Sequence, residues 1–174
     1  MDKCARFEKV SFEQFKKDIN DAFGEGIPEE LIKGYYDNIK LPRRATSGSA
    51  GYDFFMPIDI SIGVNYGNAV AKIPTGIRCR MADRYVLCMF PRSGHGFKYG
   101  IHMANTVGVI DSDYYYSDNE GHIFVKLVND SVLSKPIDFN VGDAFCQGIF
   151  FNYGVTVEDD ADGVRNGGLG STDC

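Results

Sequence analysis

The sequence lacks the basic excess that proteins need to hold a nucleic-acid polymer. Its 174 residues include 18 lysines and arginines against 24 aspartates and glutamates, which gives a net charge of −6. Proteins that bind DNA or RNA through the phosphates usually carry a positive excess. Polymeric nucleic acid is therefore not expected as a ligand, although a small anion can bind where local cations or a metal offset the field.

Signals for zinc binding, export and membrane insertion are also missing. The five cysteines form no CxxC pair and the three histidines are not closely spaced, so no zinc site is predicted. An odd number of cysteines is typical of reduced thiols in a cytoplasmic protein. The charged N-terminus MDKCARFEKV is unlike a signal peptide, and no apolar run approaches the roughly 20 residues of a membrane span. We expect a soluble, cytoplasmic protein that does not interact with membranes.

The pattern of short apolar runs predicts one globular domain with an all-β core. Hydrophobic residues make up 44% of the chain, enough to bury a substantial core. Runs rich in β-branched and aromatic residues, such as AVAKI, IRCRM, RYVLCMF and HIFVKLV, alternate with turn sequences such as PTG and NVGD. Many short strands indicate a β-sandwich or barrel. We assign residues 39–157 to this core and residues 158–174 to a flexible C-terminal tail.

We expect residues 1–38 to form a helical extension ahead of the core. Ser11 followed by Gln14 is a capping-box pattern that favours a helix over residues 11–23. The apolar face of this helix is formed by Phe12, Phe15, Ile19 and Phe23. A second short helix is expected near Pro28, a residue suited to a first helical turn.

Several segments carry only a weak chemical signal when each is read alone. PRSGHG at residues 91–96 lacks the GxSxG of a serine hydrolase, so it is an ordinary turn or an anion-binding nest. GGLGST at residues 167–172 lacks the lysine of a phosphate loop. AGYDF at residues 50–54 is the start of a strand, and its Asp53 is either a turn carboxylate or a contact to a metal. The HxE and PCxxC pattern of zinc deaminases is absent.

Taken together, five segments resemble a known enzyme family in content and order. SAGYDF, PRSG, NTVGVIDSDY, GDAFCQGIF and RNGGLGST are similar to the five motifs of the homotrimeric dUTP pyrophosphatases (dUTPases). The resemblance covers about residue 39 to the C-terminus. It implies a distorted jelly-roll β-barrel and a dUTP diphosphatase that uses magnesium (Mg2+). Such an enzyme hydrolyses dUTP to dUMP and pyrophosphate by attack of water on the α-phosphorus.

The resemblance assigns the reacting groups to the third motif. Asp111, at the end of an apolar run, would activate the attacking water. Tyr114 would pack under the deoxyribose and exclude a 2′-hydroxyl, and the strand near Phe124 would close the hairpin. The uracil edge would meet Asn105 and the backbone of Gly108, Val109 and Ile110. Fixed donors and acceptors of this kind reject cytosine, because the wrong base leaves buried polar groups unpaired.

The other motifs would supply the phosphate and metal contacts. The resemblance implies that Arg92, Ser93 and Gly94 bind phosphates and come from a different subunit than the hairpin. Gln147 would help to hold the hairpin and the phosphate region. Asp53 would reach Mg2+ through water, since magnesium binds mainly through the substrate's phosphate oxygens.

The C-terminal tail would close as a lid over a nucleotide in a neighbouring active site. Arg165 would contact the γ-phosphate. Further lid contacts would come from Leu169, Gly170, Ser171 and Thr172. Leu169 replaces the aromatic residue that usually stacks on uracil, a contact worth about 0.5–1.5 kcal/mol between rings. We therefore expect a lid that still closes but holds the base less tightly.

Two alternative functions use the same fold. A dCTP deaminase needs a glutamate where this chain has Lys126, and a lysine cannot act as that carboxylate. A regulatory protein that keeps the nucleotide pocket as a switch would dock a protein partner through the N-terminal helices. The intact Asp111 favours the hydrolase, because a pure binder has no need of it. The extra hairpin residues Tyr115–Glu120 receive no role from the sequence.

Overall fold

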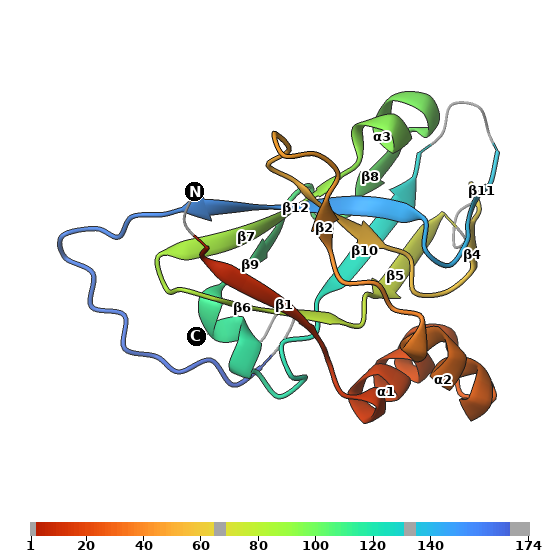
Figure 1. Ribbon diagram of the computed structural model, residues 1–174, viewed down its shortest axis with the longest axis horizontal. Helices are drawn as coiled ribbons and strands as arrows, with labels where there is room; N and C mark the ends of the chain where they lie inside the picture. The colour runs from red at the N-terminus through yellow and green to blue at the C-terminus, as the bar shows by residue number, and fades with distance from the viewer. Residues whose placement is uncertain (1–2, 65–68, 131–134, 168–174) are drawn as a thin grey trace.

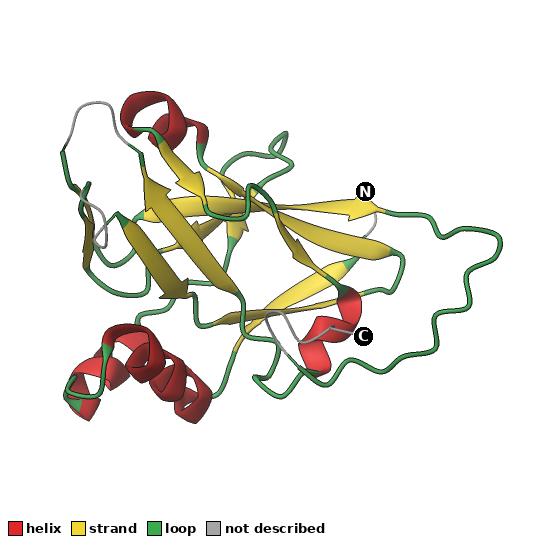
Figure 2. Cartoon of the chain, turned by 180° about the vertical axis from the view of Figure 1, so that it is seen from behind, coloured by secondary structure: helices red, strands yellow, loops and turns green. Residues whose placement is uncertain are grey.

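A barrel of short strands forms most of the molecule, with a pair of helices at one end (Figures 1 and 2). The computed structural model describes residues 3–64, 69–130 and 135–167. The predicted lid residues Leu169, Gly170, Ser171 and Thr172 lie outside these ranges. The predicted all-β core is confirmed. Across the described ranges, no helix is both long enough and apolar enough to cross a membrane.

The largest sheet holds most of the segments predicted to be functional. Its strands follow the order β2 (Arg43–Arg44), β3 (Tyr52–Phe55), β12 (Ala144–Asn152), β7 (Tyr85–Pro91) and β9 (Gly108–Ile110). All neighbouring pairs are antiparallel. Strand β12 carries the fourth motif. Because it lies between β3 and β7, the fourth motif is a direct neighbour of the first and second motifs.

Among the described residues, three smaller sheets complete the barrel, and two of them consist only of strands that follow the N-terminal helices. In one of them β10 (Phe124–Asn129) lies between β5 (Val70–Pro74) and β8 (Ile101–Met103), antiparallel to both. In the other, β4 (Ile60–Ile62) pairs with β11 (Ile137–Phe139). Residues of β10 alternate between the core and more exposed positions, as expected for a strand with one buried face.

Short helices follow two strands of the large sheet. Helix α3 (Ser93–Tyr99) begins two residues after β7 ends, and Gly100 closes it with a φ of 66°. The 3₁₀ helix η1 (Ser112–Tyr116) begins after Asp111, immediately beyond β9. Both predicted reactive turns are therefore held at the ends of strands.

The N-terminal residues form a strand before they form helices. Strand β1 (Ala5–Lys9) pairs antiparallel with β6 (Ile77–Met81). The sequence analysis did not predict β1, because its five residues alternate apolar with charged side chains too briefly to stand out. Helices α1 (Phe12–Phe23) and α2 (Glu29–Asp37) follow and confirm the two predicted helices.

Helix α1 is capped and packed largely as predicted. The Ser11 hydroxyl accepts a hydrogen bond from the backbone N–H of Gln14 at 3.1 Å. Phe15 and Ile19 are completely buried. Phe23, at the end of the helix, is 36% exposed, so the predicted apolar face reaches the core only along its first part.

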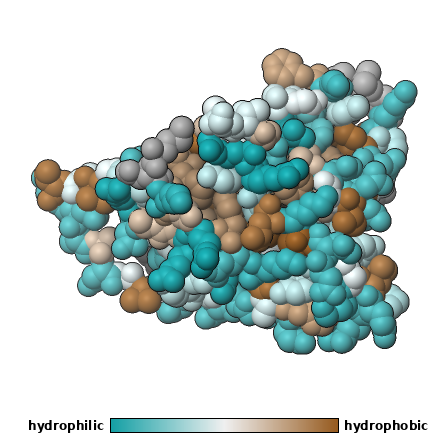
Figure 3. Space-filling model, in the orientation of Figure 1, coloured by the Kyte–Doolittle hydropathy of each residue, from teal (hydrophilic) through white to brown (hydrophobic). Residues whose placement is uncertain are grey.

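An aromatic cluster ties β1 to the large sheet. The ring centroid of Phe7 lies 5.4 Å from that of Tyr52 and 5.7 Å from that of Phe150. All three side chains line a cavity of about 590 Å³. Figure 3 shows brown and pale-brown residues gathered in a hollow near the middle of this face, over β1 and β12. These contacts fix the N-terminal segment to the sheet that carries the site.

We predict that Gly148→Ala lowers the free energy of unfolding by about 1–3 kcal/mol, the usual cost of overpacking a core. A Cβ on Gly148 would lie 2.8 Å from Cδ1 of Leu87 and 3.1 Å from Cε2 of Phe54, and both side chains are completely buried. Urea denaturation measures the change. The control Gly154→Ala, whose Cβ would meet open space, should stay within about 0.5 kcal/mol of the parent. Equal urea midpoints for the two variants would contradict this packing.

Candidate functional site

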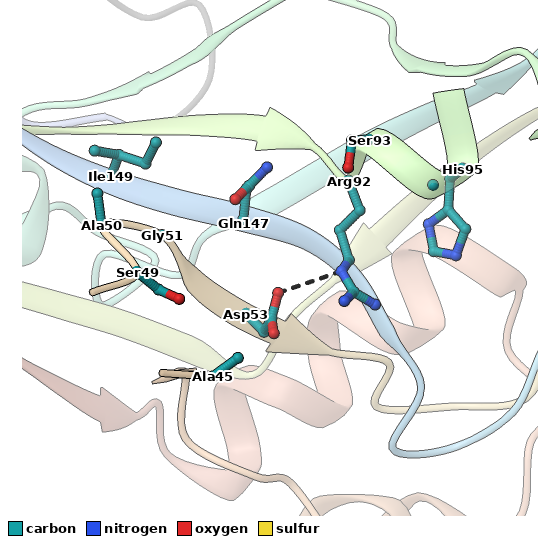
Figure 4. Close-up of a pocket in the computed structure, with 11 residues that line it drawn as sticks. Ala45, Ser49, Ala50, Gly51, Asp53, Arg92, Ser93, His95, Gln147 and Ile149 are labelled. Carbon is teal, nitrogen blue, oxygen red and sulfur yellow. Dashed lines mark ion pairs between the residues drawn. The ribbon is translucent and has the colours of Figure 1, made fainter. Parts of the chain in front are cut away.

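A polar cavity of about 630 Å³ lies beside β3, β7 and β12 (Figure 4). Its lining includes residues from the first, second and fourth predicted motifs. The sequence-predicted members are Asp53, Arg92, Ser93, Gly94 and Gln147. The remaining lining residues are Ala45, Ser49, Ala50, Gly51, His95 and Ile149. The fold thus brings together three motifs that are far apart in the sequence.

Strand register places these side chains. Gln147 of β12 lies directly opposite Asp53 of β3 and opposite Phe90 of β7. Residues opposite each other in an antiparallel pair have Cβ atoms about 4.5–5.5 Å apart. Arg92 follows the last residue of β7, which puts its side chain at the same edge of the sheet.

An ion pair spans the cavity between Arg92 and Asp53. The distance from Arg92 Nε to Asp53 Oδ1 is 3.3 Å (dashed in Figure 4), and Arg92 Nη1 donates to the carbonyl of Ala144 at 3.2 Å. The Arg92 side chain is 41% exposed. Partly exposed pairs contribute at most about 1 kcal/mol. The guanidinium can therefore exchange the carboxylate for a phosphate at low cost.

Gln147 is held in place by its neighbours on both strands. Its Nε2 donates to the carbonyl of Pro91 at 3.2 Å. A Cβ on Gly51 would lie only 2.4 Å from Gln147 Oε1, so glycine at this position leaves room for the amide. Ser93 and Gly94 are exposed at the start of α3 and face the same cavity.

The cavity fits a magnesium ion that arrives on a phosphate. Among the described residues that line the cavity, Asp53 is the one carboxylate. Within the described ranges, no group of three or more histidines, cysteines, aspartates or glutamates converges as a metal site. Magnesium usually keeps several waters and binds through one or two carboxylates together with substrate phosphates. A single partly buried aspartate beside an arginine matches that donor set.

The predicted catalytic aspartate lies in a second cluster. Asp111 Oδ2 accepts a hydrogen bond from Arg165 Nη2 at 2.6 Å, and Arg165 Nε donates to Asp113 Oδ1 at 2.9 Å. The segment after β12 brings Arg165 there, since it leaves the barrel as a long loop and returns beside η1 (Figure 1). Neither Asp111 nor Tyr114 lines the 630 Å³ cavity. Within one chain, the predicted water-activating group and the phosphate-binding residues form separate clusters.

Tyr114 is buried next to this second cluster. Its hydroxyl donates to the carbonyl of His122 at 2.8 Å and accepts a hydrogen bond from Asn119 at 2.8 Å. Burial raises the pKa of Tyr114, so the phenol stays protonated at neutral pH. The sequence analysis missed Asn119 and His122, because neither belongs to a motif and both act through contacts in the folded hairpin.

The other predicted hairpin residues follow one another along the chain. Asn105 lies in the exposed turn before β9, and Val109 is 60% exposed. Gly108 is buried, and a Cβ there would lie 3.2 Å from Met89 Cβ. β9, which ends at Ile110, pairs with β7, whereas β10, which starts at Phe124, pairs with β5 and β8. In the described chain β10 does not pair with β9, so the predicted closure of the hairpin by the strand near Phe124 is wrong, and the two strands are joined through η1 and the following turn.

Comparison with known proteins assigns the family. The dUTPase family model matches residues 37–173. This chain belongs to the dUTPase family. A deoxyuridine 5′-triphosphate nucleotidohydrolase of Lactococcus lactis is 38% identical over 148 residues, which cover 82% of this chain and 95% of that relative. The enzyme of the same name from Haemophilus ducreyi is 44% identical over 111 residues, covering 63% of this chain and 68% of that relative.

Solved dUTPase structures share the fold. The dUTPase of Streptococcus mutans superposes with a TM-score of 0.60 at 34% identity, covering 69% of this chain and 90% of that chain. The dUTPase of phage phi11 of S. aureus has a TM-score of 0.59 at 18% identity, covering 73% and 92% of the two chains. The predicted jelly-roll-like dUTPase fold is confirmed. The family match begins at residue 37, so β1, α1 and nearly all of α2 lie outside it.

We predict that Gly51→Ala weakens the binding of magnesium pyrophosphate about fivefold, the effect of losing one hydrogen bond of about 1 kcal/mol. The added Cβ forces Gln147 to move away from Pro91, which disturbs the edge of the cavity. Titration calorimetry measures the affinity. Gly48→Ala, in the same loop and with open space around its Cβ, is the control and should bind like the parent. Equal affinities for both variants would contradict this role of Gln147.

Proposed function

We propose that this protein hydrolyses dUTP to dUMP and pyrophosphate, as a dUTP diphosphatase of nucleotide metabolism. The convergence of Asp53, Arg92 and Gln147 on one polar cavity carries the proposal. The names of the relatives, which are deoxyuridine triphosphate nucleotidohydrolases, support it. Asp111 at the end of β9 supplies the carboxylate that such a reaction needs.

The phosphate chain lies in the 630 Å³ cavity in this proposal. Arg92 leaves Asp53 and binds a phosphate, while Ser93 and Gly94 add contacts from the start of α3. A fixed cation stabilises the negative charge that builds up during attack on phosphorus. Gln147 keeps this edge of the sheet in position through Pro91. Asp53 would hold a magnesium ion, which would neutralise phosphate charge when bound.

Asp111 takes the proton of the attacking water. Its side chain is 49% exposed, so water can reach the carboxylate. In the free chain one carboxylate oxygen is occupied by Arg165. A triphosphate attracts the Arg165 guanidinium more strongly than two surface carboxylates do, because it carries more charge in one place. Release of Arg165 frees Asp111 to act as the general base.

The segment from Asn105 to Tyr114 selects the nucleoside. In the proposal, Asn105 and the backbone of Gly108, Val109 and Ile110 pair with the uracil edge. Tyr114 packs under the deoxyribose, where its fixed ring leaves no room for a 2′-hydroxyl. Leu169, Gly170, Ser171 and Thr172 would complete the lid from outside the described residues.

We also propose that the active site is shared between subunits of a homotrimer. The phosphate-binding cavity does not include Asp111 or Tyr114, so one chain does not assemble a full site. The segment after β12 carries Val155, Val157 and Val164, which are 70%, 96% and 83% exposed. Apolar side chains gathered on such an arm favour a contact with another subunit.

Neither alternative function gains support from the structure. Lys126 is exposed on β10 opposite Lys72, where a deaminase of this fold would need a carboxylate. The apolar face of α1 serves in packing and is not free for a regulatory partner, since Phe15 and Ile19 are buried in the core. The cysteines of the described chain (Cys4, Cys79, Cys88 and Cys146) are free thiols, which supports the proposed cytoplasmic location.

We predict that Asp111→Asn lowers dUTP turnover by about 10²- to 10⁴-fold, the usual contribution of a general base, while nucleotide affinity is retained. Pyrophosphate release with magnesium gives the turnover, and titration with a non-hydrolysable dUTP analogue gives the affinity. The matched control is Asp113→Asn, which removes the other Arg165 contact and should keep most of the turnover. The same assay with dTTP, dCTP and UTP tests base and sugar selection. Full turnover in Asp111→Asn would refute the mechanism.

A further inference from the structure

The N-terminal segment contacts the hairpin at three points along the chain. We call residues 5–37 the N-terminal brace and residues 111–122 the hairpin loop. All of the brace except its last residue lies outside the family match, which begins at residue 37. The hairpin loop contains the extra residues Tyr115–Glu120, for which no role is predicted from the sequence. The two segments are more than 70 positions apart, yet the structure joins them.

The first contact is made by β1. The carboxylate of Glu8 accepts a hydrogen bond from the hydroxyl of Tyr115 at 2.8 Å and pairs with Arg78 at 3.1 Å. The guanidinium of Arg78 lies 4.5 Å from the centre of the Tyr115 ring. Hydrogen bonding by Tyr115 lowers the pKa of Glu8, so this carboxylate is ionised at neutral pH.

The second contact completes the cap of α1. In a capping box, the side chain three residues into the helix accepts from the N–H of the capping serine. Here Glu120 takes that place, accepting from Ser11 N at 2.7 Å and from Ser11 Oγ at 2.6 Å. Glu120 has a φ of 57°, an unfavourable backbone conformation for a residue with a side chain. The contact with Ser11 helps to hold this strained turn.

The third contact is buried. His122 is 0% exposed, and its Nε2 accepts a hydrogen bond from the backbone N–H of Gly76 at 2.7 Å. Nε2 therefore carries no proton, and Nδ1 donates to Asp18 Oδ2 of α1 at 2.5 Å. Burial would raise the pKa of Asp18, but hydrogen bonds from His122 and Gln14 outweigh it and keep the carboxylate ionised. Helix α1 thus fixes the orientation of the imidazole.

The same histidine supports Tyr114. The His122 carbonyl accepts the hydrogen bond of the Tyr114 hydroxyl, and Asn119 donates to both oxygen atoms. Tyr114 in turn lies within the single helical turn that follows Asp111. His122 therefore links the brace to Tyr114 through two separate groups: its imidazole is hydrogen-bonded to Asp18, and its backbone carbonyl is hydrogen-bonded to the Tyr114 hydroxyl.

We propose that the N-terminal brace positions Tyr114 and Asp111 for the reaction by fixing the hairpin loop. Asp18 and His122 are positioning residues in this account, and neither touches the substrate. The brace sharpens the choice of deoxyribose over ribose, because it holds the tyrosine ring that excludes the 2′-hydroxyl. This inference rests on the proposed hydrolysis of dUTP.

The test compares Asp18→Ala with the conservative Asp18→Asn in the full chain. Asp18→Ala leaves His122 Nδ1 without its acceptor, and we expect the ratio of kcat/KM for dUTP over UTP to fall about tenfold. Asp18→Asn keeps an oxygen acceptor and should restore most of the ratio. Hydrogen exchange at the hydrogen-bonded amides of Ser117, Glu120 and His122 should be faster in Asp18→Ala than in the parent.

The control Lys16→Ala breaks the 2.6 Å contact between α1 and Glu29 of α2 but leaves the hairpin contacts in place. It should change neither readout. If Asp18→Ala fails to fold, Glu120→Ala replaces it, because this variant removes the partly exposed contact with Ser11. The dUTP/UTP ratio and hydrogen exchange are then measured in the same way.

An unchanged dUTP/UTP ratio together with unchanged exchange in a folded Asp18→Ala or Glu120→Ala variant would overturn the proposal. An equal fall in the dUTP/UTP ratio together with equally faster exchange in Lys16→Ala would also overturn the proposal, since the effect would then be general destabilisation. If the parent protein fails to hydrolyse dUTP, the proposed function is wrong. Hydrogen exchange would still decide whether the brace holds the loop.

Discussion

Strand β12 pairs antiparallel with β3 on one side and β7 on the other, and the cavity proposed to bind phosphates depends on this double pairing. The register sets Gln147 against Asp53 and brings the end of β7, with Arg92 behind it, to the same edge. A slip of one residue would turn every side chain of β12 to the opposite face. The tight fit of Gly148 against Leu87 resists such a slip, so core packing and site geometry are specified by the same strand.

The charges of the site explain how an acidic protein can bind a polyanion. Both arginines expected to meet phosphates are paired with the site's own carboxylates, Arg92 with Asp53 and Arg165 with Asp111. Each pair is partly exposed and therefore weak. In the proposed function, a triphosphate would replace the carboxylates as the partner of both arginines, which would leave Asp53 available to a metal ion and Asp111 available to water. The net charge of −6 is thus compatible with nucleotide binding, because the exchange is local.

Helices and strands that are marked by a pattern within a few neighbouring residues were predicted from the sequence. Ser11 and the spacing of Phe15 and Ile19 predicted α1, and alternation along IRCRM predicted β6. The motifs named five of the residues that line the cavity, Asp53, Arg92, Ser93, Gly94 and Gln147. The pairing of Asp18 with His122 could not be predicted, since 104 positions separate two residues that belong to no motif. The pairing of Arg165 with Asp111 of its own chain depends on the course of a loop that composition does not determine.

The central claim is that one chain holds two half-sites and that complete sites form between copies. The most direct test mixes two inactive variants, Arg92→Ala and Asp111→Asn, by unfolding and refolding them together in equal amounts. Shared sites predict that about a quarter of the parent activity returns, because some sites then combine an intact Arg92 from one chain with an intact Asp111 from another. Activity that stays at the level of the separate variants, although mixed oligomers form, would contradict the account.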